Sequence, residues 1–140
     1  ADKSVSFRWE EALSFEGRSG PFVQYSYARA TTLLRKAAEE GLVVPDRPSG
    51  AALSTPAEQD LLRVLARFPQ VVAGAARTKH VHSVAGYAHD LAEAFNRFYQ
   101  TVPVLKAEGE RATRLALVAG VRQALGNSLA LLGLAKLDRM

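Results

Sequence analysis

Apolar residues recur every three or four positions along most of the chain, which is the spacing of one face of an α-helix. The first such stretch covers residues 21–40. It begins at Pro21, whose missing N–H would be unpaired in a first helical turn anyway, and it stops before Gly41. Its apolar face consists of Val23, Tyr27, Ala30, Leu33, Leu34 and Ala37. The pattern predicts a long amphipathic helix here.

A second helix is predicted to begin at Pro56, after a loop rich in proline and glycine. Thr55 and Glu58 have the spacing of a capping box, in which each side chain bonds the backbone N–H of the other residue. Pro69 is expected to end or kink this helix, and a short helix over about 69–76 follows. The face of the second helix is assigned to Leu61, Leu62, Leu65 and Phe68.

Two further helices follow a polar break at residues 79–83. The first ends before Pro103 and the last runs from about 110 to 132, while residues 1–18 allow one or two helical turns. Their apolar stripes are Val84, Ala88, Leu91, Phe95 and Phe98, and then Leu115, Val118, Val121, Leu125, Leu129 and Leu132. Strand-type alternation is absent from the sequence. The predicted fold is all-α, an antiparallel bundle of four to five helices.

Length and composition narrow the class of protein. The chain has 140 residues, which fits one domain, and it has no cysteine. Disulfides, thiol nucleophiles and cysteine-based metal sites are therefore excluded. The sequence shows neither an apolar stretch of membrane-spanning length nor a signal peptide, so we expect a soluble cytoplasmic protein without a membrane partner.

The charge is mildly basic, with a formal net charge of +4 and 13 Arg among the 18 basic residues. Arginine binds phosphates and stacks on bases better than lysine does, so the balance is compatible with a nucleic-acid partner. The alternative explanation is a GC-rich genome, which also favours arginine over lysine.

The sequence offers little chemistry. His80 and His82 lie in the polar break with no third ligand at a recognisable spacing, so we expect solvated loop histidines and no metal site. His89 and Asp90 are neighbours on a helix, so their side chains are predicted to point apart. Catalytic residues are expected to be absent.

Tyrosine and arginine side chains form the one candidate surface. Tyr25 and Arg29 are four residues apart and share a helix face, and Tyr99 is rotated away from the core position Phe98. Such side chains suit unpaired RNA bases, which stack on aromatic rings and guanidinium planes. The alternative is core packing with the tyrosine hydroxyls at the rim.

Three ordered segments resemble the arginyl-tRNA synthetase family. Residues 14–29, SFEGRSGPFVQYSYAR, resemble the family's Gly-x-Thr/Ser-Gly/Ala-Pro-Tyr-Leu-Gln-Tyr-Ala-His-Ala-Arg segment. Residues 91–99, LAEAFNRFY, and the ending 138–140, DRM, resemble its LA-x-x-F-N-x-F-Y helix and its Glu-Arg-Met ending. Phe22, Tyr27 and Ser128 depart from the family's usual Tyr, His and Gly. The resemblance implies the all-helical anticodon-binding domain of this family, called DALR.

The resemblance implies an anticodon-binding role for Tyr25, Arg29, Tyr99 and Met140. Gln24 and Asn96, which stand in the same two groupings of aromatic and basic residues, complete the six candidate residues. Their expected partner is the anticodon loop of arginine tRNAs, which mostly share C as the middle base. Phosphates would be held by Arg29, and flipped bases would stack on Tyr25 or Tyr99. A carboxylate at Met140 would either accept from the cytosine amino group or only dock the terminus.

The resemblance also implies a domain organisation. Residues 1–20 would lead in from the end of a catalytic domain, and 21–140 would form the anticodon-binding bundle. The family's H-I-G-H-like and K-M-S-K-S-like motifs are absent, so we expect no catalysis and no cofactor in this chain, with ATP and Mg bound in the parent enzyme's catalytic domain. We expect a monomer. The alternatives are a stand-alone helical interaction or regulatory module, and the related domain of the cysteine synthetase.

Overall fold

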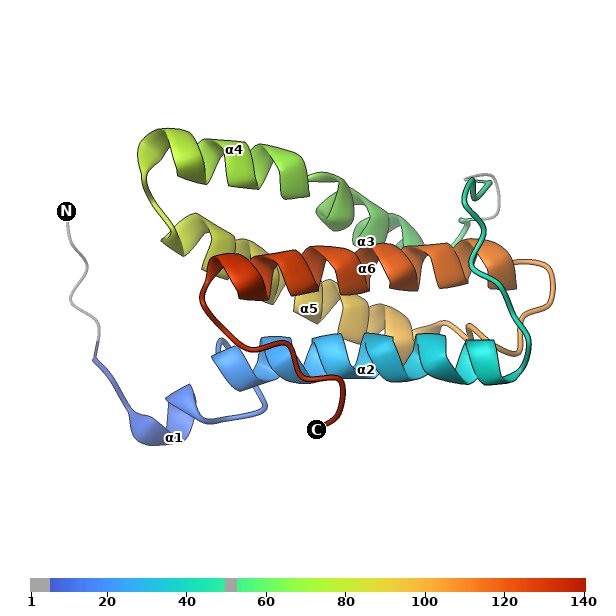
Figure 1. The fold of residues 1–140 in the computed structure, drawn as a ribbon, viewed down its shortest axis with the longest axis horizontal. Helices are drawn as coiled ribbons and strands as arrows, with labels where there is room; N and C mark the ends of the chain where they lie inside the picture. Colours follow the sequence, from blue (N-terminus) through green and yellow to red (C-terminus); the bar gives the residue numbers. More distant parts are fainter. Residues whose placement is uncertain (1–5, 50–52) are drawn as a thin grey trace.

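Helices account for all the regular structure in residues 6–49 and 53–140, the part of the chain that the computed structural model describes (Figure 1). A single turn, α1, precedes five longer helices. The bounds are α1 Trp9–Ala12, α2 Gly20–Glu39, α3 Pro56–Ala66, α4 Phe68–Thr78, α5 His82–Thr101 and α6 Arg111–Leu131. The predicted all-α class is confirmed.

The helix starts follow local signals in the sequence. The Ser19 hydroxyl accepts a hydrogen bond from the Phe22 N–H at 3.2 Å and caps α2. At α3 the predicted capping box is complete, because the Thr55 hydroxyl accepts from the Glu58 N–H and the Glu58 carboxylate accepts from the Thr55 N–H. Only Arg67 separates α3 from α4, and Pro69 lies in the first turn of the new helix, which begins one residue earlier than predicted, at Phe68.

The connection before α5 differs slightly from the prediction. Helix α4 continues to Thr78, and Lys79 then adopts a left-handed conformation with φ 58° that turns the chain. His82, which was assigned to the polar break, is the first residue of α5.

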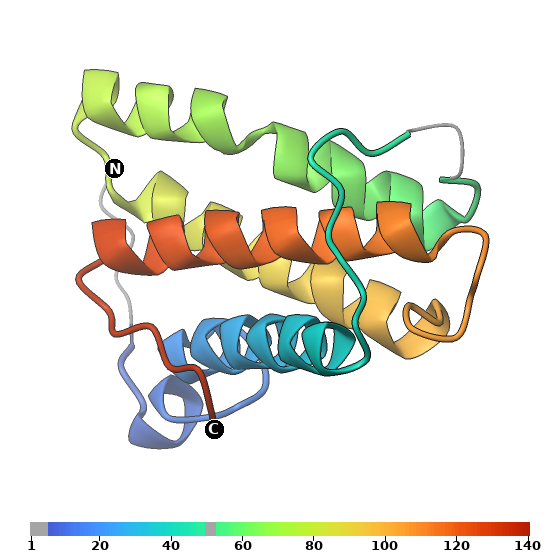
Figure 2. The same ribbon diagram turned by 45° about the vertical axis from the view of Figure 1, so that its right-hand side comes forward.

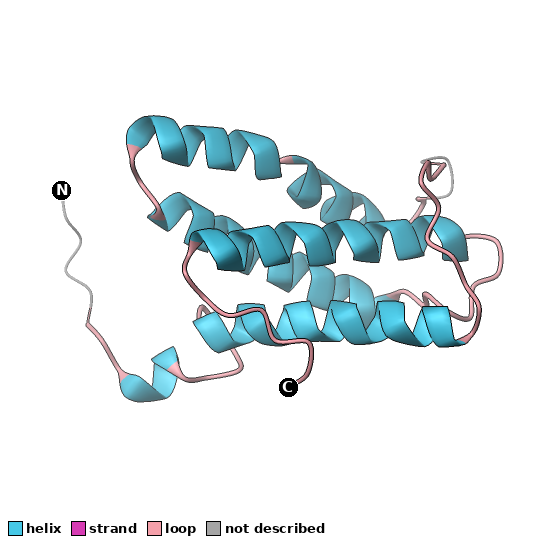
Figure 3. Ribbon diagram, in the orientation of Figure 1, coloured by secondary structure: helices cyan, strands magenta, loops and turns pink. Residues whose placement is uncertain are grey.

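The bundle is built around α2, α5 and α6, which contact one another in pairs. Helix α6 runs antiparallel to the other two, while α3 and α4 pack against α5 (Figure 1 and, after a 45° turn, Figure 2). Loops join the helices at the two ends of the bundle, as the secondary-structure colouring of Figure 3 shows.

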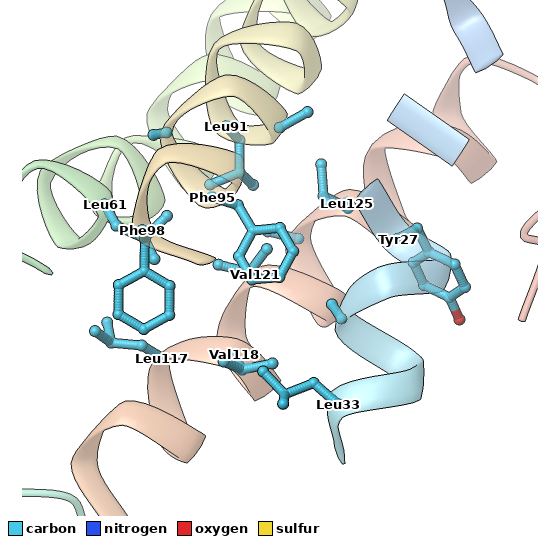
Figure 4. Packing of buried hydrophobic residues seen from close by; sticks show 14 of the residues in the cluster. Tyr27, Leu33, Leu61, Leu91, Phe95, Phe98, Leu117, Val118, Val121 and Leu125 are labelled. Atoms are coloured by element: carbon cyan, nitrogen blue, oxygen red, sulfur yellow. The ribbon is translucent and has the colours of Figure 1, made fainter. Parts of the chain in front are cut away.

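The predicted stripes meet in the centre of the bundle. Phe95 and Phe98 of α5 are fully buried in one core cluster with Val121 and Leu117 of α6; in Figure 4 the Phe95 ring lies beside Val121 and the Phe98 ring points toward Leu117. The stripes assigned to α5 and α6 are buried except for the half-buried Leu132, but Leu62 of α3 is exposed, contrary to its assignment. Helix α3 packs on the bundle with one narrow face, and Leu62 lies outside that face.

An ion pair fastens α3 to α6 inside the bundle. The fully buried Glu58 carboxylate accepts from Nε of Arg114, whose Nη1 also donates to the Pro103 carbonyl at 2.8 Å. Burial acts to raise the pKa of Glu58, but the hydrogen bonds from Thr55 and Arg114 outweigh it and hold the pKa below its ordinary value of 4.5. The capping carboxylate therefore also locks two helices together.

Across the described ranges, every helix is too short or too polar to cross a bilayer.

Candidate functional site

The structure brings three of the six candidate residues into one stack. The Arg29 guanidinium lies 4.5 Å from the ring centroid of Tyr25, on the same helix, and 4.6 Å from that of Tyr99, on α5. Its Nη2 also donates a hydrogen bond to the Tyr25 hydroxyl. The cation is thus held between two electron-rich ring faces, an arrangement that fixes its position and that of both rings.

Asn96 contacts this stack through Arg29. Its side-chain NH₂ donates to the Ser26 hydroxyl at 2.7 Å and to the Ala92 carbonyl at 2.8 Å, which leaves Oδ1 to accept from Nη1 of Arg29. Ser26 is fully buried and donates in turn to the Phe22 carbonyl. The side chain of Asn96 therefore makes its hydrogen bonds within the protein, and it positions Arg29.

Gln24 lies beside the C-terminal segment. Its Nε2 donates to the Ala135 carbonyl at 3.0 Å, a contact between residues 111 positions apart. The structure thus places Gln24 where it holds residues 132–140 on α2, and it does not bring Gln24 into the stack.

The C-terminal segment is also held through Arg122 of α6. Gly133 takes φ +70°, which lets the chain leave α6 and turn back across α2 (Figure 1). Arg122 donates from Nε to the Thr31 hydroxyl at 2.9 Å, lies 5.3 Å above the Tyr27 ring and approaches Asp138 to 3.9 Å. These contacts place the last two residues next to the stacked side chains.

An open groove of about 570 Å³ results from this arrangement. Tyr99 is 41% and Met140 51% exposed, so both present surface to solvent. The groove is lined by Tyr25, Ala28, Arg29, Thr32, Arg35, Tyr99, Arg139 and Met140. Aromatic faces and guanidinium groups side by side in an open groove form a chemically suitable surface for an unpaired, phosphate-bearing strand.

Four lining residues are not among the six candidates: Ala28, Thr32, Arg35 and Arg139. Thr32 lies three residues after Arg29 and Arg35 three after that, so the helical spacing that paired Tyr25 with Arg29 would have reached both. Arg139 stands in the DRM ending beside Met140, but only the fold of the tail shows that it meets α2.

The histidines form no comparable site. The rings of His80 and His82 lie 5.3 Å apart, and the described ranges contain no cluster of three His, Asp or Glu side chains able to hold a metal. The prediction that His89 and Asp90 point apart is wrong, because Nδ1 of His89 comes within 3.8 Å of Asp90 Oδ1. The His89 ring instead packs on Phe22, with the ring centroids 5.4 Å apart.

Comparisons with known proteins agree with these features. A family model described as the DALR anticodon binding domain matches residues 23–140. Arginine–tRNA ligases of Pyrococcus abyssi and Haloarcula marismortui are 46% and 48% identical over 99% and 94% of the chain. The chain spans about a fifth of their length, 22% in each case.

A solved structure gives the same picture. The arginyl-tRNA synthetase of Thermus thermophilus superposes with a TM-score of 0.86 at 39% identity, over 99% of this chain and 24% of that one.

Proposed function

The chain belongs to the family of DALR anticodon-binding domains found in arginyl-tRNA synthetases, and from this premise we propose that its groove binds the anticodon loop of arginine tRNAs. The observation that carries the proposal is the stack of Arg29 between Tyr25 and Tyr99, open to solvent beside Arg35 and Arg139. Bases of an opened loop stack on such rings, and phosphates pair with such guanidinium groups.

The groove residues divide into two kinds. Tyr99 offers the more exposed ring and serves as the stacking platform, while Arg35 and Arg139 lie at the groove wall and contact phosphates. Arg29 is already engaged by both tyrosines and by Asn96. The main role of Arg29 is therefore to hold the two tyrosines in place, and contact with the RNA is its lesser role.

The wider role follows from the relatives. We propose that the domain supports arginylation of tRNA by a longer synthetase, whose catalytic domain precedes it and binds ATP with Mg. A cytoplasmic location and a monomeric state belong to the same proposal. Its support is that the matched relatives are arginine–tRNA ligases.

A titration of the chain with two hairpins from one arginine tRNA tests the proposal. The anticodon stem–loop is expected to bind and the acceptor-stem hairpin is not, with a shallow salt dependence because few phosphates are neutralised. Equal binding of both hairpins would show that the groove does not read the anticodon arm.

Arg29→Ala is expected to weaken binding of the stem–loop, because the stack loses its central cation. Arg47→Ala is the matched control, since Arg47 is an exposed arginine that does not line the groove. Thermal unfolding of both variants separates a loss of binding from a loss of fold. If both substitutions weaken binding alike, the effect is general charge and the groove assignment fails.

A further inference from the structure

The tail, residues 132–140, completes the groove but is mostly exposed. It carries two of the groove residues, Arg139 and Met140, and it crosses α2 after leaving α6 (Figure 1). Leu132 and Leu137 are half-buried, and the other residues of the tail are exposed. A segment with so little buried apolar surface detaches from the bundle at a low free-energy cost. The position of Arg139 and Met140 therefore depends on the polar contacts of the tail.

In the described ranges, two side chains of the bundle make polar contacts with the tail. Gln24 of α2 donates to the Ala135 carbonyl at 3.0 Å, and Nη2 of Arg122 on α6 lies 3.9 Å from Oδ1 of Asp138. Asp138 immediately precedes Arg139, so the contact with Arg122 is the one nearest to the groove residues of the tail. Arg122 does not line the groove itself. Its place is thus suited to positioning the groove residues rather than to contacting RNA.

The guanidinium of Arg122 is fixed before it meets the tail. Its Nε donates to the Thr31 hydroxyl at 2.9 Å, and its central carbon lies 5.3 Å from the centroid of the Tyr27 ring. Tyr27 is buried in the core, so this ring is a rigid platform. A cation held over an aromatic face has little freedom left to lose. Arg122 therefore offers Asp138 a preformed partner.

Gly126 of α6 makes room for the tail beside this platform. A Cβ atom at Gly126 would stand 3.1 Å from Cε2 of Tyr27 and 3.3 Å from Cδ of Lys136. Both distances are shorter than the 3.5–4.0 Å at which carbon atoms pack best. The missing side chain lets the Tyr27 ring and the stem of Lys136 lie together on α6. The tail therefore also packs on α6 between its two polar contacts, at Ala135 and Asp138.

The pair of Arg122 and Asp138 is weak by itself. Their side chains are 41% and 71% exposed, so water and salt screen the attraction. A weak contact still matters for a segment that is loosely held, because the apparent affinity of a site falls with the fraction of molecules in the competent state. Loss of the pair is therefore expected to lower RNA affinity severalfold without abolishing binding.

We propose that Arg122 is a positioning residue of the RNA-binding groove, which holds Asp138 and thereby keeps Arg139 and Met140 at the groove. The proposal rests on the proposed function in taking the groove as an RNA site. RNA that contacts Arg139 and Met140 favours the docked tail in turn, so docking of the tail and binding of RNA are linked.

A double-mutant cycle on Arg122 and Asp138 tests the proposal through the affinity for the arginine anticodon stem–loop. The variants are Arg122→Gln, Asp138→Asn and the two combined, each titrated calorimetrically. We expect each single substitution to weaken binding severalfold and the double variant to bind no more weakly than either single one. General charge predicts the opposite for Asp138→Asn, because removing a carboxylate strengthens the attraction to phosphates.

Two results of this cycle would overturn the proposal: tighter binding by Asp138→Asn, or effects of the two substitutions that add. Arg97→Gln is the matched control, because Arg97 also pairs with a surface aspartate, Asp60 at 3.0 Å, and does not line the groove. Arg97→Gln is expected to bind as the parent does. A loss of affinity equal to that of Arg122→Gln would likewise overturn the proposal.

Limited trypsin digestion reads the position of the tail without RNA. Lys136 packs on α6 in the docked tail, so cleavage after Lys136 requires the tail to detach. We expect Arg122→Gln and Asp138→Asn each to accelerate this cleavage severalfold, with cleavage after the exposed Lys106, between α5 and α6, unchanged. Equal rates at Lys136 in parent and variants would overturn the proposal. If the parent chain fails to bind the stem–loop, the proposed function fails, while the trypsin rates still decide whether Arg122 holds the tail.

Discussion

Arg29 is the residue on which the site depends. Its guanidinium meets two tyrosine rings and two oxygen acceptors, and one acceptor, Asn96, is itself oriented by the buried Ser26. A cation with this many partners loses little further freedom on binding, which favours a preformed site. Tyr99 differs because 41% of it is exposed to solvent.

Tyr99→Ala is expected to weaken binding of the anticodon stem–loop by about 1–3 kcal/mol, the value of a base stacked on an aromatic ring. Tyr99→Phe keeps the ring and should bind nearly as the parent does. Isothermal titration calorimetry measures both, beside thermal unfolding. A Tyr99→Ala variant that melts earlier but binds normally would mean that the ring only packs.

The residue scale also shows where sequence reasoning stops. The pairing of Tyr25 with Arg29 follows from helical spacing, but the approach of Tyr99 does not, because it lies 70 positions beyond Arg29. Gln24 and Asn96 were predicted to contact RNA because of their aromatic and basic neighbours, and in the structure their side chains bond the C-terminal segment and Arg29. Supporting roles of this kind depend on contacts between residues far apart in the sequence, which helical spacing does not reveal.

At the scale of helices, local signals account for most of what could be predicted. The capping box at Thr55 and Glu58, the start near Pro21 and the buried stripe of α5 are all confirmed. The exposed Leu62, the entry of His82 into α5 and the docking of the tail were not foreseen. Each of these is decided by which neighbouring element covers the residue.

Leu91→Ala tests the core stripe of α5. Leu91 is fully buried, so its truncation should lower the free energy of unfolding by about 2–5 kcal/mol. The preference of the folded fraction among different stem–loops should not change, because Leu91 does not line the groove. Urea unfolding and stem–loop titration at low temperature check the two halves, and altered loop preference would contradict this assignment.

The Glu58–Arg114 pair predicts how stability depends on pH. Because the folded-state pKa of Glu58 is lowered, its contribution is complete well above pH 4.5 and is lost as the pH falls below 4.5 through the folded pKa. Urea unfolding at a series of pH values should therefore show an acid limb to which Glu58 contributes.

Glu58→Gln should cost about 3–5 kcal/mol at neutral pH, since Arg114 keeps its charge in a buried place. The same variant should flatten the acid limb. Asp60→Asn is the matched control, because Asp60 pairs with Arg97 on the surface and its loss should matter little. An unchanged acid limb in Glu58→Gln would show that another group governs the transition.

At the scale of the whole molecule, the groove joins parts of the chain that are far apart in sequence. The arginine-lined groove is formed by α2, α5 and the C-terminal segment. A net charge of +4 is modest, but three arginines line the groove where an RNA loop would lie, and one of them, Arg35, pairs with Glu39 on the surface. Composition alone could not have located this concentration, because it depends on the tail folding back on α2.

Beyond binding the anticodon loop, we propose that the groove distinguishes the middle base, which is C in most arginine anticodons. The most direct test is a calorimetric titration of the chain with two stem–loops that differ only in that base, C in one and U in the other. We predict that the loop with C binds tighter by about 1–3 kcal/mol, the range for a hydrogen-bonding group that loses its partner. Equal affinity for the two loops would contradict the account.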